Sequence, residues 1–137
     1  MTKADRATAQ HFAERYRVAP AEVSRQIELA VIGGDWGANG YTTKAQADIL
    51  ANTLGLRPGM RLLDLGAGRG WPGLYLAAAT GCHAVLADVP IEGLQEAAAR
   101  AHRETLTART APVAASARAL PFAPAAFDAI VHTDMLC

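Results

Sequence analysis

Short apolar runs alternate with longer stretches of mixed polarity along the second half of the chain. Continuous apolar runs of this length are typical of strands that are buried in a parallel sheet. They predict strands at residues 62–65, 84–87, 113–115 and 126–131. Helices are expected between them over residues 72–79 and 90–104, each with a proline near its first turn. The alternation predicts an α/β fold, in which a parallel sheet of about four strands carries helices on both faces through right-handed crossovers.

The first part of the chain is helical in character. Its pattern predicts helices over residues 4–16, 20–31 and 44–54, and Thr42 or Thr43 can cap the third of them. We therefore expect two parts, which are an N-terminal helical segment at residues 1–57, packing on or capping the sheet, and a partial α/β domain at residues 58–137.

The first predicted strand runs directly into a glycine-rich turn, Leu-Leu-Asp-Leu-Gly-Ala-Gly-Arg-Gly at residues 62–70. Glycines let the backbone approach a ligand closely and adopt positive φ, and a carboxylate at the strand's end can meet a cationic group. The nonapeptide resembles the first signature of class I S-adenosylmethionine-dependent methyltransferases, an acidic residue followed by G-x-G-x-G. The resemblance implies a Rossmann-like fold whose loop wraps the methionine part of the cofactor. The matching residues are Asp64, Gly66, Gly68 and Gly70, with Ala67 between them.

An alternative register fits a dinucleotide site. Residues 68–73 satisfy G-x-G-x-x-G, and Asp88 lies at the spacing of the acid that binds the ribose of NAD. This register would place Asp64 inside the buried strand, where an unpaired carboxylate is costly. The methyltransferase register uses Asp64 and all three early glycines, so it is favoured. An NAD-dependent oxidoreductase stays the alternative, although the chain has no Tyr-x-x-x-Lys pair of the short-chain reductase kind.

Polar residues at the ends of the later strands supply the rest of the expected cofactor site, because ligands of open α/β sheets bind beyond the carboxyl ends of the strands. Asp88 can accept hydrogen bonds from both hydroxyls of a ribose, and Val89 can lie against the adenine. Residues 116–122 resemble the third signature of the family, with Ser116 where an aspartate is common. The resemblance implies adenine contacts from Ser116 and from the backbone of Ala117.

Further candidates lie at the fourth strand and before the first. His132 could act as a general base, since its pKa is ordinarily near neutrality, and Thr133 stands where the methyl group would point. In related enzymes an aromatic residue in the region of Tyr41 can reach the cofactor's carboxylate. The N-P-P-aromatic signature of enzymes that methylate amino groups of adenine or glutamine is absent. A small-molecule acceptor is therefore expected.

Composition limits the partners and the compartment. The formal net charge is zero and 19% of residues are charged, so no footprint for nucleic acid or an anionic membrane is visible. The apolar runs are too short to span a bilayer, and two distant cysteines indicate neither a disulfide framework nor a metal cluster. These features predict a cytoplasmic protein without a metal, and the resemblance implies S-adenosylmethionine as its cofactor.

The sequence stops within a strand-like segment at residues 127–137, so the resemblance covers the front half of the family's fold. We therefore expect a truncated methyltransferase domain. A second hypothesis is a catalytically inactive fold that self-associates through the edge of the fourth strand, because bare strand edges template pairing.

Overall fold

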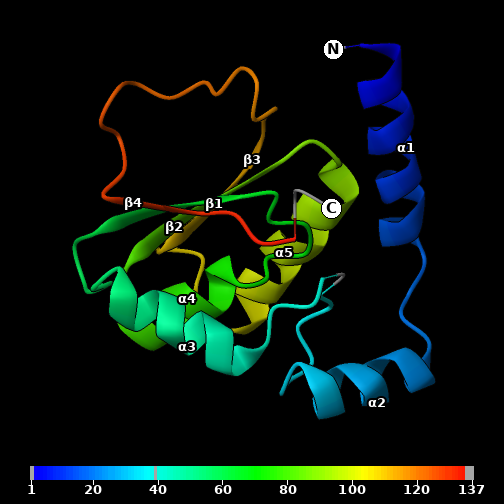
Figure 1. Cartoon of the computed structure of the whole chain (residues 1–137), viewed down its shortest axis with the longest axis horizontal. Coiled ribbons are helices and arrows are strands. Elements are labelled where there is room, and N and C mark those ends of the chain that lie inside the picture. Colours follow the sequence, from blue (N-terminus) through cyan, green and yellow to red (C-terminus); the bar gives the residue numbers. More distant parts are fainter. Residues whose placement is uncertain (1, 39, 135–137) are drawn as a thin grey trace.

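The computed structural model describes residues 2–38 and 40–134, whose helices and strands alternate after an N-terminal helical part (Figure 1). The element bounds in chain order are α1 Lys3–Arg17, α2 Glu22–Val31, α3 Lys44–Thr53, β1 Arg61–Leu65, α4 Gly73–Thr80, β2 His83–Asp88, α5 Ile91–Arg103, β3 Thr110–Ala114 and β4 Ala129–Val131. The predicted elements are therefore present, with shifted bounds. The fourth strand begins at residue 129 instead of 126, and the third begins at residue 110 instead of 113.

The described strands form one parallel sheet in the order β3-β2-β1-β4, which confirms the predicted Rossmann-like class. The chain moves outward from β1 to β2 and β3, and then returns to place β4 on the other side of β1. The carboxyl ends of β1 and β4 thus flank the point where the direction of winding reverses. Open α/β sheets bind their ligands at this switch point.

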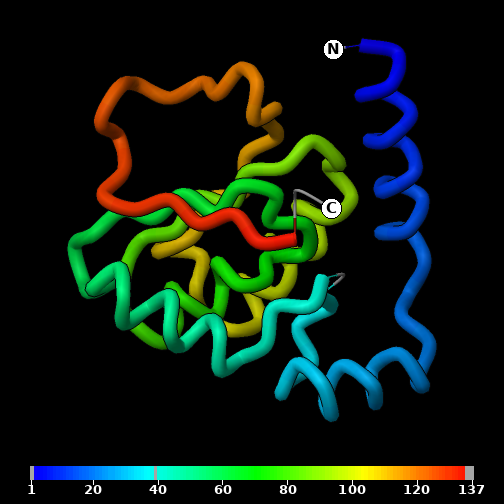
Figure 2. The backbone as a smooth tube through the Cα atoms, viewed as in Figure 1, coloured from blue at the N-terminus to red at the C-terminus, as the bar shows by residue number. Residues whose placement is uncertain are grey.

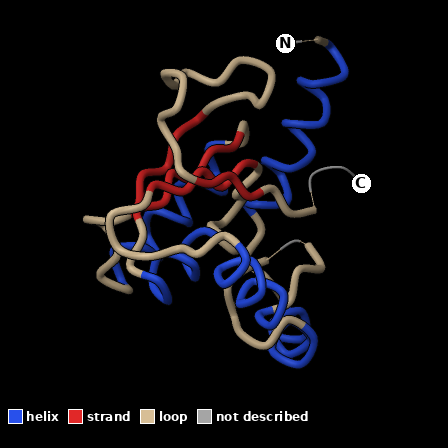
Figure 3. Tube along the Cα trace, turned by 60° about the vertical axis from the view of Figure 1, so that its left-hand side comes forward, coloured by secondary structure: helices blue, strands red, loops and turns tan. Residues whose placement is uncertain are grey.

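Three helices pack against one face of the sheet. Right-handed crossovers from β1 to β2 and from β2 to β3 run in the same direction, so α4 and α5 reach the same face. They share one apolar core with α3 and with the strand side chains of that face, which are Leu62, Ala84, Leu86, Ala129 and Val131. Among the residues described, those at 115–128, which lead from β3 to β4, form no helix, whereas the sequence predicted helices on both faces (Figure 3). That segment carries Pro121 and Pro124, and it lacks an apolar period of 3.6 residues.

Local sequence signals explain several element ends. Thr43 caps α3 through a capping box with Gln46, which decides between the two predicted threonines. Gly81 ends α4 with φ of +75°, a left-handed conformation that glycine adopts without a steric cost.

The apolar side chains of the N-terminal helices do not decide which side of α2 is buried. Figure 2 shows α1 to one side of the sheet, and α1 contacts α5. On α2, the apolar side chains of Val23, Ile27 and Val31 are exposed, whereas the carboxylate of Glu28 is buried. The buried side of α2 is therefore set by polar contacts with the following loop.

Candidate functional site

A cavity of about 450 Å³ lies beyond the carboxyl ends of the strands, and its size is in the range of small-molecule sites. Its walls come from α1, from the loop before α3, from the glycine turn after β1, and from the ends of β2, β3 and β4. Segments that are far apart in the sequence therefore meet at one place, as the strand-end rule predicts.

Most of the predicted site residues line this cavity. They are Gly66, Ala67, Gly68, Asp88, Val89, Ser116, Ala117 and Thr133. Four other candidates are not among its lining residues, namely Asp64, Gly70, Tyr41 and His132. The side chain of Tyr41 is 83% exposed, and His132 is also exposed. The proposed contacts of Tyr41 with a cofactor and of His132 with an acceptor therefore have no support from the arrangement of these two side chains.

Asp88 connects the end of β2 to the glycine turn. Its Oδ2 accepts a hydrogen bond from the backbone N–H of Gly68 at 2.7 Å, and its Oδ1 accepts one from the N–H of Val89 at 2.7 Å. Partial burial raises the pKa of the Asp88 carboxyl, and the two N–H groups act against that rise. Each carboxylate oxygen retains a lone pair that can accept from a hydroxyl group in the cavity.

The three positions of the turn require glycine for different structural reasons. Gly66 and Gly68 have φ of +80° and +51° and line the cavity. A Cβ atom on Gly68 would also lie 2.6 Å from the hydroxyl of Tyr16 on α1. Gly70, at φ of +97°, faces the core instead, where a Cβ atom would lie 2.5 Å from Cδ1 of Leu74. Gly70 thus allows the turn to pack on α4 and is not part of the cavity wall.

Asp64 lies one residue before the end of β1, as in the predicted strand, but its side chain does not line the cavity. It lies within β1 with a fully buried side chain, and its Oδ2 accepts a hydrogen bond from the N–H of Gly73 at 2.8 Å. The structure gives the expected contact with a cationic group no support, because the partner it provides is an N–H of the first turn of α4, whose dipole favours a negative charge there. Burial of Asp64 therefore does not distinguish the methyltransferase register from the dinucleotide register.

Burial raises the pKa of Asp64 to about 7, with the Gly73 N–H lowering it and the charge of Asp88 raising it. The native state then binds a proton more tightly than the unfolded chain does between pH 4 and 7. The free energy of unfolding should fall as pH rises through this window, by up to about 1.4 kcal/mol per pH unit. We expect Asp64→Asn to reduce that slope, measured by urea unfolding at several pH values.

Asp5, which is half-buried on α1, offers a control for this experiment. Its pKa is lowered by hydrogen bonds from Thr2, so its titration falls below the same pH window. Asp5→Asn should leave the slope between pH 4 and 7 unchanged. Equal slopes for the Asp64→Asn variant and the original protein would contradict the assignment of a raised pKa to Asp64.

One wall of the cavity was missed by the sequence analysis. The side of α1 that faces the cavity comprises Asp5, Thr8, Ala9, Phe12 and Tyr16. Their spacing of three and four residues is a helical face, but the face mixes polar and apolar side chains. No pattern in the sequence distinguishes such a face from one that is solvated.

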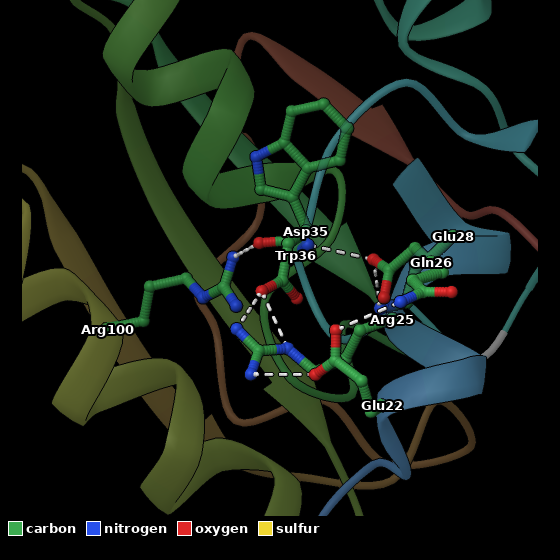
Figure 4. A network of polar contacts seen from close by, with 8 residues as sticks. Glu22, Arg25, Gln26, Glu28, Asp35, Trp36 and Arg100 are labelled. Atoms are coloured by element: carbon green, nitrogen blue, oxygen red, sulfur yellow. Dashed lines mark hydrogen bonds and ion pairs between the residues drawn. The ribbon is translucent and has the colours of Figure 1, made fainter. Parts of the chain in front are cut away.

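The loop before α3 forms a second wall that was also missed, and polar contacts fix its shape (Figure 4). The buried Glu28 accepts hydrogen bonds from the N–H groups of Trp36 and Ala38 at 2.8 and 3.0 Å. Arg25 pairs with the Asp35 carboxylate at 2.7 Å, and Arg100 of α5 donates to the Asp35 carbonyl at 2.6 Å. These contacts hold the backbone that presents Gly37 and Ala38 to the cavity.

The same loop is tied to the end of β4 and to the glycine turn. Asp134 accepts hydrogen bonds from the N–H groups of Tyr41 and Thr42. The indole of Trp71 donates to the carbonyl of Thr42 at 2.9 Å and stacks on Trp36 with ring centroids 4.0 Å apart. Trp71 therefore packs the loop against the glycine turn, and it also lines the cavity.

Neither a metal centre nor a membrane span is found in the part of the chain that the structure covers. Within residues 2–38 and 40–134, no three His, Cys, Asp or Glu side chains are grouped so that they could hold a metal ion. None of the helices in those ranges combines the length and the apolar character that crossing a membrane requires.

Residues 62–137 match the model of the methyltransferase domain family. The fold, the glycine turn and this match over more than half of the chain define a class I S-adenosylmethionine-dependent methyltransferase domain, and the predicted resemblance is confirmed. The chain belongs to this family. It spans 23% and 41% of the length of two curated relatives that it matches.

Individual relatives agree with this assignment. The chain is 38% identical over 90 residues to botryococcene C-methyltransferase of Botryococcus braunii, which is 64% of this chain and 23% of that protein. The structure of the cyclase SpnF is similar with a TM-score of 0.62 and 26% identity, over 82% of this chain and 48% of SpnF. A Geobacter sulfurreducens methyltransferase solved with S-adenosylhomocysteine has a TM-score of 0.50 and 28% identity, over 55% of this chain and 30% of its own.

Proposed function

We propose that the cavity binds S-adenosylmethionine and that the chain contributes to methyl transfer to a small-molecule acceptor. The observation that carries the proposal is the Asp88 carboxylate, which lines the cavity while holding the N–H of Gly68 in the glycine turn. The membership in the methyltransferase family and the S-adenosylhomocysteine in the Geobacter sulfurreducens structure support it.

The residues present fit this cofactor. Asp88 can accept hydrogen bonds from the two hydroxyls of a ribose, and the absence of side chains at Gly66 and Gly68 admits the methionine part close to the backbone. Val89 offers an apolar surface to an adenine, and Ser116 offers a hydroxyl to its edge. Bound S-adenosylmethionine supplies an electrophilic methyl group on a sulfonium.

For the chain itself, the task in such a reaction is alignment. Direct displacement at a methyl carbon requires mainly that the acceptor atom and the methyl group be held close and in line. The wall formed by α1 carries Ala9 and Phe12. We infer that this wall contacts the acceptor.

Calorimetric titration with S-adenosylhomocysteine tests whether the cavity binds the proposed cofactor. Titration with NAD⁺ tests the alternative, an NAD-dependent oxidoreductase. We expect saturable one-site binding of S-adenosylhomocysteine and no heat of binding for NAD⁺ at the same concentrations. Binding of NAD⁺ with none of S-adenosylhomocysteine would overturn the proposal. Methyl transfer needs a separate assay with labelled S-adenosylmethionine, because the similar SpnF structure belongs to a cyclase.

Self-association through β4 stays a prediction. This strand is an edge of the sheet formed by residues 61–131, and the side chain of Ile130 on it is 56% exposed. Gel filtration at several protein concentrations tests it, since a concentration-dependent elution volume is expected from pairing of edges.

A further inference from the structure

Arg69 is a buried cation in the middle of the glycine turn. Its side chain is 7% exposed, although arginine is rarely buried without partners that compensate the loss of water. Its backbone lies between Gly68, which lines the cavity, and Gly70, which packs on the core. The side chain therefore extends from the cofactor turn toward another part of the molecule, and its contacts show which part.

The guanidinium group holds the C-terminal end of α1. Its Nη2 donates toward the carbonyl oxygens of Arg15, Tyr16 and Val18, at 3.3, 3.2 and 3.0 Å. The last carbonyls of a helix have no partner within the helix, and they form its negative end, so a cation is favourable there. We call these contacts, together with an ion pair between Nε of Arg69 and Oε2 of Glu96 at 2.7 Å, the arginine clasp.

Tyr16 completes the attachment. Its ring lies 5.3 Å from the Arg69 guanidinium. A Cβ atom on Gly68 would lie 2.6 Å from the Tyr16 hydroxyl, and one on Gly93 would lie 3.1 Å from Cδ2 of its ring. The end of α1 is thus in contact with the glycine turn and with α5 at the same time.

Two other polar links of α1 to the domain, both within the described residues, involve an exposed arginine. Arg17 pairs with Glu92 at 2.6 Å, and its side chain is 65% exposed. Arg118 pairs with Asp5 at 3.0 Å, and its side chain is 73% exposed. Exposed ion pairs contribute little to stability, so these two links hold α1 less firmly than the clasp does.

We propose that Arg69 is a positioning residue, which fixes α1 as a wall of the cavity before a ligand binds. The inference rests on the proposed function, because the ligand that benefits is S-adenosylmethionine. A wall that is already in place does not have to be ordered at the expense of binding free energy. Without the clasp, α1 would be ordered only when a ligand contacts both it and the glycine turn.

Hydrogen exchange of the Arg69→Met variant tests this proposal. Methionine keeps the apolar stem but cannot bond the helix carbonyls. In the absence of ligand, we expect the amides of α1 to lose protection, while those of β1, β2 and α4 keep theirs. Saturating S-adenosylhomocysteine should restore the protection of α1, and its affinity should be lower by about tenfold, with a more favourable enthalpy and a less favourable entropy of binding.

Two further variants sharpen the test. Arg17→Met removes an arginine that also joins α1 to α5, but from the exposed pair, and it should leave the protection of α1 close to its original level. Glu96→Gln keeps the shape of its side chain and removes the charge that faces Arg69. If Arg69→Met does not fold, Glu96→Gln decides the matter, since it should accelerate exchange at the C-terminal amides of α1.

Several results would overturn the proposal. Unchanged protection of α1 in the Arg69 or the Glu96 variant would do so, and so would a parallel loss of protection in all elements, which indicates a general stabilising role. If α1 loses protection and S-adenosylhomocysteine does not restore it, the ordering of α1 is not coupled to ligand binding, which contradicts the proposal. A failure of the original protein to bind S-adenosylhomocysteine would instead reject the proposed function, which the titration detects separately.

Discussion

Asp88→Ala is expected to weaken the binding of S-adenosylhomocysteine by about 100-fold or more. The substitution removes the carboxylate proposed to accept two ribose hydroxyls, and hydrogen bonds to charged groups contribute about 1.5–3 kcal/mol each. It also removes the acceptor of the Gly68 and Val89 N–H groups, so the glycine turn loses one of its links to β2, while the carbonyl of Ala87 still accepts from the N–H groups of Gly66 and Ala67. Calorimetric titration measures the change in affinity.

Asp128→Ala is the matched control. Asp128 also accepts a hydrogen bond from a backbone N–H, that of Arg61 at 2.8 Å, but it does not line the cavity. Its loss should lower stability without a large change in affinity. Asp88→Asn should be intermediate, because an amide offers one acceptor oxygen where the carboxylate offers two. Unchanged affinity in Asp88→Ala would reject Asp88 as a cofactor ligand.

Gly70→Ala is expected to destabilise the fold by about 2–4 kcal/mol. Alanine is strained at φ of +97°, and its Cβ atom would lie 2.5 Å from Cδ1 of Leu74 and 3.2 Å from Cβ of Ala97. These contacts lie in a packed core that cannot relax freely. Thermal and urea unfolding followed by circular dichroism measure the effect.

Gly59→Ala separates backbone strain from overpacking. Gly59 has a similar φ of +89°, and a Cβ atom there would meet nothing within 4 Å. It should cost about 1–2 kcal/mol, from strain alone. Equal losses of stability in the two variants would show that the contacts of Gly70 with the core are not important, and the role assigned to Gly70 would then be wrong.

The glycine turn shows how far sequence reasoning reached at the site. The residues beyond β1 and β2, among them Gly68 and Asp88, were predicted as neighbours because parallel strands bring their carboxyl ends together. Their contact at 2.7 Å agrees with that reasoning. Asp64 was predicted to face a ligand as well, yet it faces α4. The predicted end of the strand at residue 65 was correct, but a run of apolar residues does not reveal whether a polar side chain within it faces the core or a ligand.

The two cavity walls supplied by α1 and by the loop before α3 could not be predicted from the sequence. Phe12 and Gly37 line the cavity together with the glycine turn, where a buried arginine bonds to carbonyls at the end of α1 and a buried glutamate bonds to N–H groups of the loop. Such contacts leave no period and no motif, since any exposed segment has carbonyl and N–H groups to offer.

By itself, the sequence determined the parallel α/β class, the order of the elements and the position of the glycine turn. These features follow from apolar runs and from glycines, whose effects act over a few residues. Only the tertiary structure decided that Asp64 and Gly70 support the core, that Arg69 reaches α1, and that α1 lines the cavity. The physical reason is that these contacts depend on which distant segments pack against one another and exclude water, and no local sequence pattern indicates which segments those are.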